Sequence, residues 1–308
     1  MNTISPLVSH NLAIAKVLAI LLVATGHFFT GNLLWIPVTL GLFTFAWSSA
    51  LFTTLKHGEH LNLATFWRNK LKGLGLRFLL IQLFLLVLVA IQHRSGIFTW
   101  QTLVHLSGQT GWLNWFGIPN ASPLGGGLWF FTLLLLFYLA FPVLACWQRN
   151  ARASAVITIA IVIVACWLSN TVNVGHALWI TAAAFVVGIH CARHSFPGNA
   201  EFWLALAVAA TLGMGLLNVA WGIHSANSAL IMLIAFAGLQ WLTKTGIKLP
   251  AGPLARLTPC TLEIYLIHGY LFIGHDWHTP FAYLSSMALI VVVAFVLNLL
   301  LTKLERKT

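Results

Sequence analysis

The chain has 308 residues, of which 59% are hydrophobic and only 7% are charged. So small a charged fraction excludes an ordinary soluble domain and indicates an integral membrane protein. The formal charge of +11 would suit a nucleic-acid partner. However, the basic residues form short clusters between apolar segments, as loops at a cytoplasmic membrane surface do, so we expect no nucleic acid.

Apolar segments long enough to cross a bilayer follow one another along the whole sequence. We predict an all-α integral membrane protein of about ten transmembrane helices that form a single domain over residues 1–308. If both termini are cytoplasmic, nearly all of the 16 Lys and Arg residues fall in inside loops, which is the arrangement that membrane proteins favour. The predicted spans are 11–30, 33–55, 75–92, 127–147, 154–172, 175–191, 201–217, 221–242, 257–275 and 280–301.

The first span contains two polar residues, Lys16 and His27. Eleven residues at 100° each leave them about 20° apart around a helix and roughly 16 Å apart along its axis. A charge within the bilayer costs about 3 kcal/mol or more, so this face should contact protein or water rather than lipid. A lysine that extends its ammonium to the interface and a hydrogen-bonded interfacial histidine would explain the same residues.

The long outside loop, 93–126, is rich in Trp, Asn, Pro and Gly, which predicts an ordered or re-entrant cap rather than another span. Trp129 begins the helix that follows it, where a tryptophan is commonly an interfacial anchor.

The ninth span contains a second polar group in "CTLEIYLIHGYLF". Tyr265 and His268 are three residues apart and share a face, whereas Glu263 is about 140° away from His268. Because Glu263 and Lys16 are expected at similar depth, an intramembrane Lys16–Glu263 ion pair is one hypothesis.

Taken together, these segments resemble the acyltransferase-3 family of membrane O-acyltransferases. Lys16 and His27 reproduce the family's spacing of a basic residue, ten residues and a histidine. "GLFTFAWSSALF", "FWRNKLKGLG", "LWFFTLLLLFYLAFP", "FVVGIHCAR" and "TLEIYLIH" are similar to further family segments, and they occur in the family's order. The resemblance spans nearly the whole chain.

The resemblance implies that an acyl-CoA, usually acetyl-CoA, donates its acyl group to a hydroxyl of a carbohydrate or lipid-linked glycan at a bacterial cytoplasmic membrane. A hydroxyl needs a base, and neutral imidazole can take its proton near pH 7, so His27 is the expected general base. A covalent acyl-His27 intermediate is the alternative. Lys16 would position the donor or stabilise negative charge.

The other expected site residues surround the two substrates. Trp129, Tyr265, His268 and Glu263 are candidates for substrate binding. The basic stretch between the second and third spans would bind the phosphates of CoA, although it can equally be a topology signal. Its members are Lys56, Arg68, Lys70, Lys72 and Arg77.

Several other interpretations compete with this one. Ten helices with polar groups near the midplane would suit a transporter, although paired halves are not evident. A membrane acyltransferase of another family that acetylates an amino sugar, or a non-catalytic sensor, is a further alternative. His190 and His194, and His275, Asp276 and His278, do not present the three or four ligands of a metal site, so no metal is expected.

Overall fold

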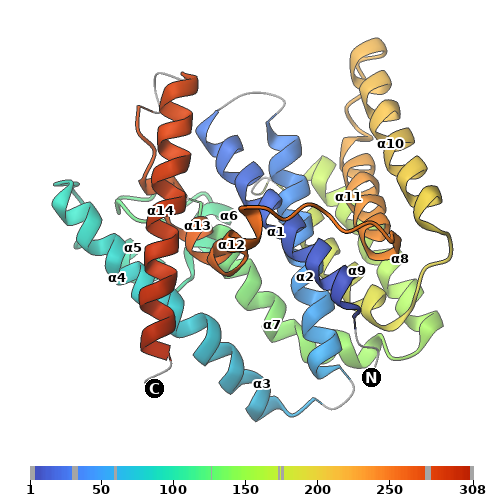
Figure 1. Cartoon of the computed structure of the whole chain (residues 1–308), viewed down its shortest axis with the longest axis horizontal. Helices are drawn as coiled ribbons and strands as arrows, with labels where there is room; N and C mark the ends of the chain where they lie inside the picture. The colour runs from blue at the N-terminus through green and yellow to red at the C-terminus, as the bar shows by residue number, and fades with distance from the viewer. Residues whose placement is uncertain are drawn as a thin grey trace. The chain divides into compact units, whose positions relative to one another are not determined.

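The structure is a computed structural model that describes residues 4–29, 34–58, 61–125, 127–172, 174, 177–274 and 279–305. Every regular element in these ranges is helical, and loops join the helices (Figure 1). The predicted all-helical class is therefore confirmed.

Seven helices in the described part are long and apolar enough to cross a membrane. The predicted count of about ten is not confirmed, since α9 (Leu178–Arg193) is shorter and α11 (Asn227–Lys244) falls outside this set. The cytoplasmic position of both termini stays a prediction. The seven are α1 (Pro6–Phe28), α2 (Trp35–His57), the continuous stretch Leu63–Ile91, α7 (Trp129–Trp147), α8 (Ala151–Thr171), α10 (Ala200–Ala220) and α14 (Pro280–Glu305).

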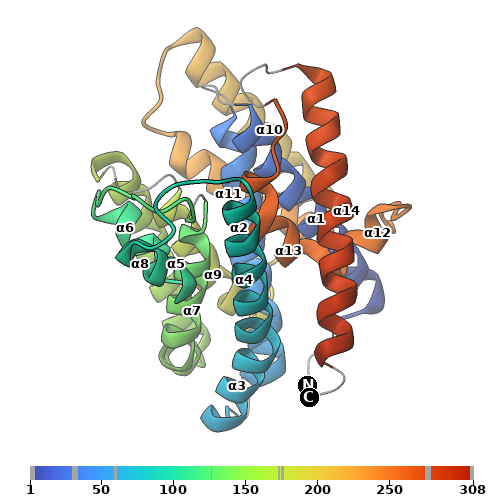
Figure 2. The same cartoon turned by 90° about the vertical axis from the view of Figure 1, so that its left-hand side faces the viewer.

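The third span begins earlier than predicted. Helix α3 (Leu63–Lys70), the π-helical turn η1 (Leu71–Gly75) and α4 (Leu76–Ile91) follow one another without a break (Figure 2). Asn62 caps the start, because its side-chain oxygen accepts a hydrogen bond from the Thr65 N–H at 2.9 Å. A side-chain cap of this kind satisfies a donor that a helix start otherwise leaves unpaired. The basic stretch is therefore helical from Arg68 to Arg77, not a loop.

The ninth predicted span is not one helix. It consists of α12 (Leu254–Leu257), the 3₁₀ turn η2 (Thr258–Cys260), α13 (Thr261–Ile267) and the 3₁₀ turn η3 (His268–Tyr270). Pro259 cannot donate a backbone hydrogen bond, and its carbonyl accepts one from the Asn298 side chain at 2.8 Å. The prediction of an unbroken helix was wrong because side chains replace helical backbone bonds here.

The described chain divides into two compact units. The first unit contains Met1–Val23, Gly31–Leu61 and Ala140–Ala255, and the second contains Ala24–Thr30, Asn62–Leu139 and Arg256–Thr308.

The first unit is organised around the packing of α2 against α9, with α8 also against α9 and α10 against α11. A glycine permits the close approach of α2 and α9. A Cβ at Gly188 would lie 2.4 Å from the Trp47 carbonyl oxygen, so any side chain would force the helices apart. Trp47 itself is fully buried.

The second unit packs α13 against α14 and α4. Phe78 of α4 stacks on Phe131 of α7 with ring centroids 3.9 Å apart. The last turn of α1 is attached through Thr25, whose hydroxyl lies 2.8 Å from the Tyr283 hydroxyl of α14. The prediction of ordered structure rather than another span is confirmed for residues 93–125, which contain the short helices α5 (Trp100–Leu106) and α6 (Thr110–Trp115). The outside position of this segment stays a prediction.

Candidate active site

Two histidines of the second unit meet directly. His27, in the last turn of α1, places its Nδ1 2.7 Å from Nε2 of His268, at the end of α13. The two rings are nearly parallel, with an interplanar angle of 11° and centroids 5.0 Å apart. His268 is 1% exposed, whereas His27 is half-buried and therefore the more accessible of the two.

The hydrogen bonds of this pair fix which nitrogen carries each proton. Nδ1 of His268 faces the carbonyl oxygens of Tyr265 at 2.7 Å and Ile264 at 3.2 Å. A carbonyl only accepts, so His268 donates from Nδ1 and, as a neutral ring, accepts at Nε2. His27 must then donate from Nδ1, which leaves its Nε2 as the basic nitrogen of a neutral imidazole. The broken helix thus sets the tautomer of His27.

Two tyrosines hold a glycine-containing turn beside the histidines. The Tyr265 hydroxyl donates to the Gly127 carbonyl at 2.6 Å, and the Gly125 N–H donates to the Tyr270 hydroxyl at 2.8 Å. Gly127 has φ of +73°, and a Cβ there would lie 3.6 Å from Cε1 of His27. This backbone conformation favours glycine, so Gly127 lets the turn adopt it without strain beside the imidazoles.

A third histidine stabilises the loop that leads into this turn. His105 is buried, with Nδ1 2.9 Å from the Thr110 hydroxyl and Nε2 2.9 Å from the Asn120 side-chain oxygen. Burial lowers the pKa of His105, and the hydrogen bond with Asn120 opposes this effect in part. A Cβ at Gly125 would come within 2.2 Å of the His105 ring, so the turn packs directly on it.

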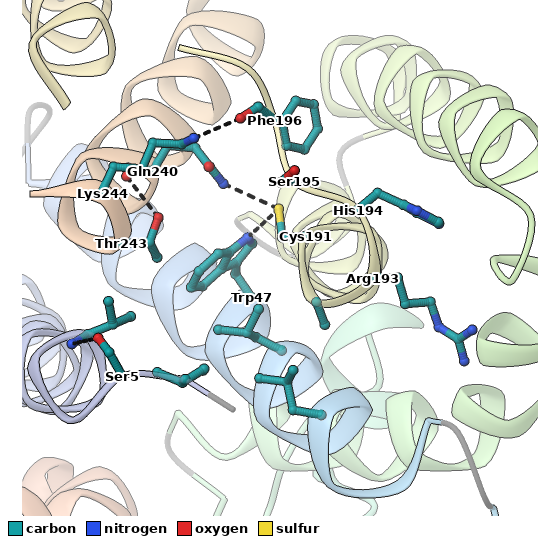
Figure 3. Close-up of a pocket in the computed structure, with 15 residues that line it drawn as sticks. Ser5, Trp47, Cys191, Arg193, His194, Ser195, Phe196, Gln240, Thr243 and Lys244 are labelled. Atoms are coloured by element: carbon teal, nitrogen blue, oxygen red, sulfur yellow. Dashed lines mark hydrogen bonds between the residues drawn. The ribbon is translucent and has the colours of Figure 1, made fainter. Parts of the chain in front are cut away.

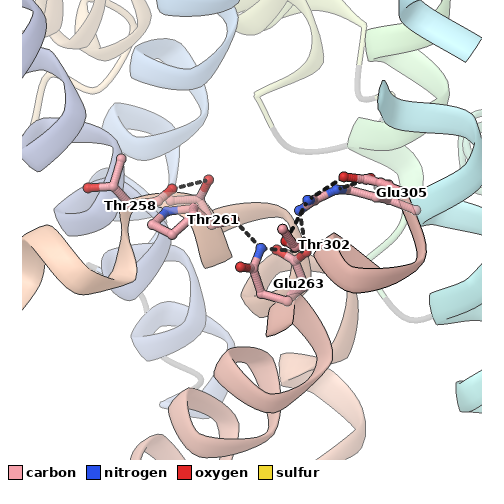
Figure 4. Close-up of polar contacts among 8 residues, drawn as sticks. Thr258, Thr261, Glu263, Thr302 and Glu305 are labelled. Atoms are coloured by element: carbon pink, nitrogen blue, oxygen red, sulfur yellow. Dashed lines mark hydrogen bonds and ion pairs between the residues drawn. The ribbon is translucent and has the colours of Figure 1, made fainter. Parts of the chain in front are cut away.

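Glu263 is paired with an arginine rather than with Lys16. Its carboxylate is fully buried and lies 2.9 Å from Nη1 of Arg77, and the Asn298 side chain donates to the same oxygen at 3.2 Å. Arg77 also binds Glu305, at 2.5 Å from Nε and 2.9 Å from Nη2. Figure 4 shows Glu263, Thr302 and Glu305 gathered at this point. The hypothesis of a Lys16–Glu263 pair was therefore wrong, because Arg77 of α4 already neutralises Glu263.

Lys16 belongs to the first unit and His27 to the second. The ammonium of Lys16 lies 5.2 Å from the centroid of the Phe52 ring of α2. A cation above an aromatic face is attracted to it, which lowers the cost of a charge within a span. Trp129, at the first position of α7, is half-buried and packs edge-on against Phe130 with ring centroids 6.2 Å apart.

The basic stretch is divided between the two units. Lys56 lies at the end of α2 in the first unit, whereas the other four residues belong to the second. There, Arg77 is held by Glu263 and Glu305, and Lys70 lies 3.7 Å from the centroid of the Tyr138 ring. Arg68 and Lys72 are exposed. Among the four basic residues of the stretch that belong to the second unit, these two are the most accessible to a phosphate.

The first unit has a pocket of about 400 Å³ where α2, α9 and α11 end and α1 begins. Figure 3 shows Cys191 at its centre, with its sulfur accepting hydrogen bonds from Trp47 and Gln240, both at 3.4 Å. Lys244 and Arg193 also line it, but they donate to the carbonyls of Phe196 and Gly58 at 2.7 and 2.8 Å. Cations near helix C-termini stabilise the exposed carbonyls, so both have a structural role here.

The histidines that were weighed as metal ligands have other partners. His190 Nδ1 lies 2.7 Å from the Ser154 hydroxyl, and His194 Nε2 lies 3.2 Å from the Gln148 carbonyl. Within the ranges that the structure describes, no three His, Cys, Asp or Glu residues are grouped to hold a metal ion. His275, Asp276 and His278 lie outside the described residues.

Sequence reasoning selected His27, His268 and Tyr265 but missed three contributors to the site. These are Gly127, Tyr270 and His105, none of which stands out in the sequence, since their roles depend on contacts between segments far apart in the chain. The glycine run before Trp129 was the only available signal, because consecutive glycines often mark a backbone that approaches another group closely.

The geometry defines a helical membrane protein with a hydrogen-bonded pair of imidazoles, one at the end of α1 and one at the end of α13. The family comparison then identifies it: residues 9–302 match the model described as "Acyltransferase domain", and the chain belongs to the acyltransferase-3 family. This membership supports an acyltransferase activity.

One relative is "Nodulation protein 10" of Rhizobium leguminosarum bv. viciae. It is 27% identical over 186 residues, which cover 52% of this chain and 50% of the relative. The match thus spans about half the length of that protein. No solved structure significantly matches this chain.

Proposed function

We propose that this protein is a membrane O-acyltransferase that moves an acyl group, most simply acetyl, from acyl-CoA to a hydroxyl of a carbohydrate or glycolipid. The observation that carries this proposal is the 2.7 Å contact between Nδ1 of His27 and Nε2 of His268. It supports a base at Nε2 of His27 that is already in the correct tautomer to accept a proton.

The proposed reaction uses that nitrogen twice. Nε2 of His27 removes the proton from the acceptor hydroxyl while its oxygen attacks the thioester carbonyl. The new C–O bond forms, the C–S bond breaks, and the CoA thiolate takes the proton from the His27 imidazolium. The products are an O-acyl ester and CoA, and His27 is regenerated.

The role of His268 in this scheme is to position and stabilise His27. When His27 is protonated, its Nδ1–H still donates to Nε2 of His268, and the backbone carbonyls of Ile264 and Tyr265 accept from the far side of that ring. A hydrogen bond from a charged donor is stronger than one from a neutral donor. The row of hydrogen bonds from His27 through His268 to the two carbonyls therefore favours the state in which His27 is protonated.

The other site residues are assigned to binding of the acceptor and of the acyl donor. We propose that Tyr265, which donates to the Gly127 carbonyl, and Trp129, two residues after Gly127, contact the acceptor, and that Lys16 attracts the donor. Arg68 and Lys72 are the proposed phosphate contacts, since Arg77 and Lys70 already have partners.

The test is acyl transfer by the purified protein in lipid nanodiscs. Acetyl-CoA labelled in the acetyl group is supplied with glycans extracted from the cell envelope, and labelled ester and free CoA are both measured. His27→Ala should reduce transfer by at least roughly 100-fold, the lower range for loss of a general base. His194→Ala, which changes a histidine of the first unit, is the matched control and should retain the rate.

The same measurement distinguishes an acyl-enzyme from a direct transfer. A covalent acyl-His27 would release CoA in a burst before any acceptor is added, whereas direct transfer would not. Normal transfer by a correctly inserted His27→Ala protein would refute the proposed function.

A further inference from the structure

The first unit has a second cavity, at the other end of its helices from the pocket around Cys191. Its volume is about 410 Å³, within the range of small-molecule sites. It lies where α2, α9 and α11 begin and α8 ends, and its lining includes Trp35, Asn170, Trp179, His224 and Asn227. Among the described residues that line it, none is Asp, Glu, Lys or Arg.

Neutral hydrogen-bonding groups dominate this cavity. Besides the residues above, Thr39, Ser169, Thr171 and Ser228 contribute hydroxyls. A hydroxyl both donates and accepts, and an amide presents two donors and a carbonyl oxygen. Such a set matches a ligand that carries many hydroxyls, which also both donate and accept.

A network of side chains holds one wall of the cavity in place. The amides of Asn218 and Asn227 are bonded reciprocally at 2.7 and 3.0 Å, and Nδ1 of His224 is bonded to the Asn218 oxygen. Because that oxygen only accepts, His224 donates from Nδ1 and its neutral ring accepts at Nε2. Asn227 and His224 are therefore positioned before any ligand arrives.

Backbone donors are also present at this end. The cap residues of α2, α9 and α11 are Leu34, Ala177 and Ala226, and none makes a side-chain capping bond. The first N–H groups of a helix have no partner within the helix, but the Asn227 N–H of α11 donates to the His224 carbonyl at 3.1 Å, and Pro37 of α2 has no N–H. The remaining first-turn N–H groups of these helices are the backbone donors at this end.

Two indole rings complete the cavity. Trp35 is 36% exposed, so part of its ring can be reached. Trp179 has a buried Nε1–H with no hydrogen-bond partner in the part of the chain that the structure describes. An indole offers an apolar face and one donor, which is suited to the apolar face and the hydroxyls of a pyranose.

From these observations we infer that the cavity, lined by Trp35, Trp179, Asn227 and His224, binds a neutral pyranose unit of the carbohydrate acceptor. The inference rests on the proposed function for the identity of the ligand. It concerns binding within the first unit, whereas the chemistry is assigned to the histidine pair of the second.

The test is saturation-transfer NMR on the full chain in lipid nanodiscs, since maltoside detergents would compete. Methyl β-glucopyranoside is the probe, and mannitol is an acyclic control that has hydroxyls but no ring face. The glucoside should bind and mannitol should not. Trp35→Ala should weaken binding roughly tenfold through loss of a ring contact. Trp179→Phe, which keeps a ring but removes the N–H, should weaken it about fivefold, the effect of one hydrogen bond.

Trp167→Ala is the matched control, because Trp167 is an exposed tryptophan of α8 outside the cavity and should leave binding unchanged. Equal binding of mannitol, or wild-type affinity in both cavity variants, would overturn the inference.

The outcome is separable from that of the proposed function. His27→Ala should abolish acyl transfer and still bind the glucoside. If acyl transfer requires His27 but the cavity variants bind the glucoside with wild-type affinity, only the inference that the cavity binds a pyranose is refuted. If glucoside binding requires Trp35 but the wild-type protein shows no acyl transfer, only the assignment as an enzyme is refuted.

Discussion

Replacing His268 tests whether the second imidazole acts through His27. In His268→Ala the Nδ1–H of His27 loses the acceptor that lies 2.7 Å away. As His27 becomes charged during the reaction, the lost bond is one to a charged group, worth about 1.5–3 kcal/mol. At 1.36 kcal/mol per factor of ten, the rate of acyl transfer should fall roughly 10- to 150-fold.

A conservative variant separates hydrogen bonding from packing. Glutamine can accept the Nδ1–H of His27 through its side-chain oxygen, so His268→Gln should recover a large part of the rate, whereas His268→Leu should not. The assay is transfer of labelled acetyl in nanodiscs, with the thermal midpoint of each variant measured in parallel. Combining His268→Ala with His27→Ala should add no further loss, because His268 acts through His27.

Two results would refute this reasoning. A His268→Ala protein within twofold of the wild-type rate would show that the contact has no part in the reaction. Equal losses in the Gln and Leu variants at unchanged stability would show that the acceptor at this position is not what matters.

Two further predictions concern stability. Arg77→Ala leaves the fully buried Glu263 without its cation, so the free energy of unfolding should fall by about 3 kcal/mol. Adding Glu263→Gln should restore part of it, and thermal unfolding in nanodiscs measures both; an unchanged midpoint in Arg77→Ala would contradict the ion pair's role. Burial lowers the pKa of His105, so its neutral form stabilises the loop fully above its ordinary pKa of about 6.5, and this contribution decreases as pH falls through the lowered value. The protection of residues 93–125 against hydrogen exchange, relative to the intrinsic exchange rate at each pH, should therefore decrease below about pH 6.5 in the wild type and less so in His105→Gln. Identical pH profiles of protection would show that His105 is not responsible.

The sequence by itself determined the class of the protein, and it singled out the residue to which the proposal assigns the base. Apolar segments separated by basic clusters have only one common physical explanation, which is a chain of membrane helices. His27 could be selected because an imidazole within an apolar span is costly unless it has a function or a partner. The start of the third span was missed, since Asn62 caps a helix that the hydrophobic pattern alone does not reveal.

Only the tertiary structure decided which side chains interact with Glu263 and with His27. Glu263 could have been neutralised by any cation at its depth, and it is the fold that brings Arg77 rather than Lys16 to it. The contact of His27 with His268 joins residues 241 positions apart, and the break in the helix after α13 sets the direction of its hydrogen bonds. Periodicity reports which face of one helix a residue occupies, but it carries no information on which face of another helix lies opposite.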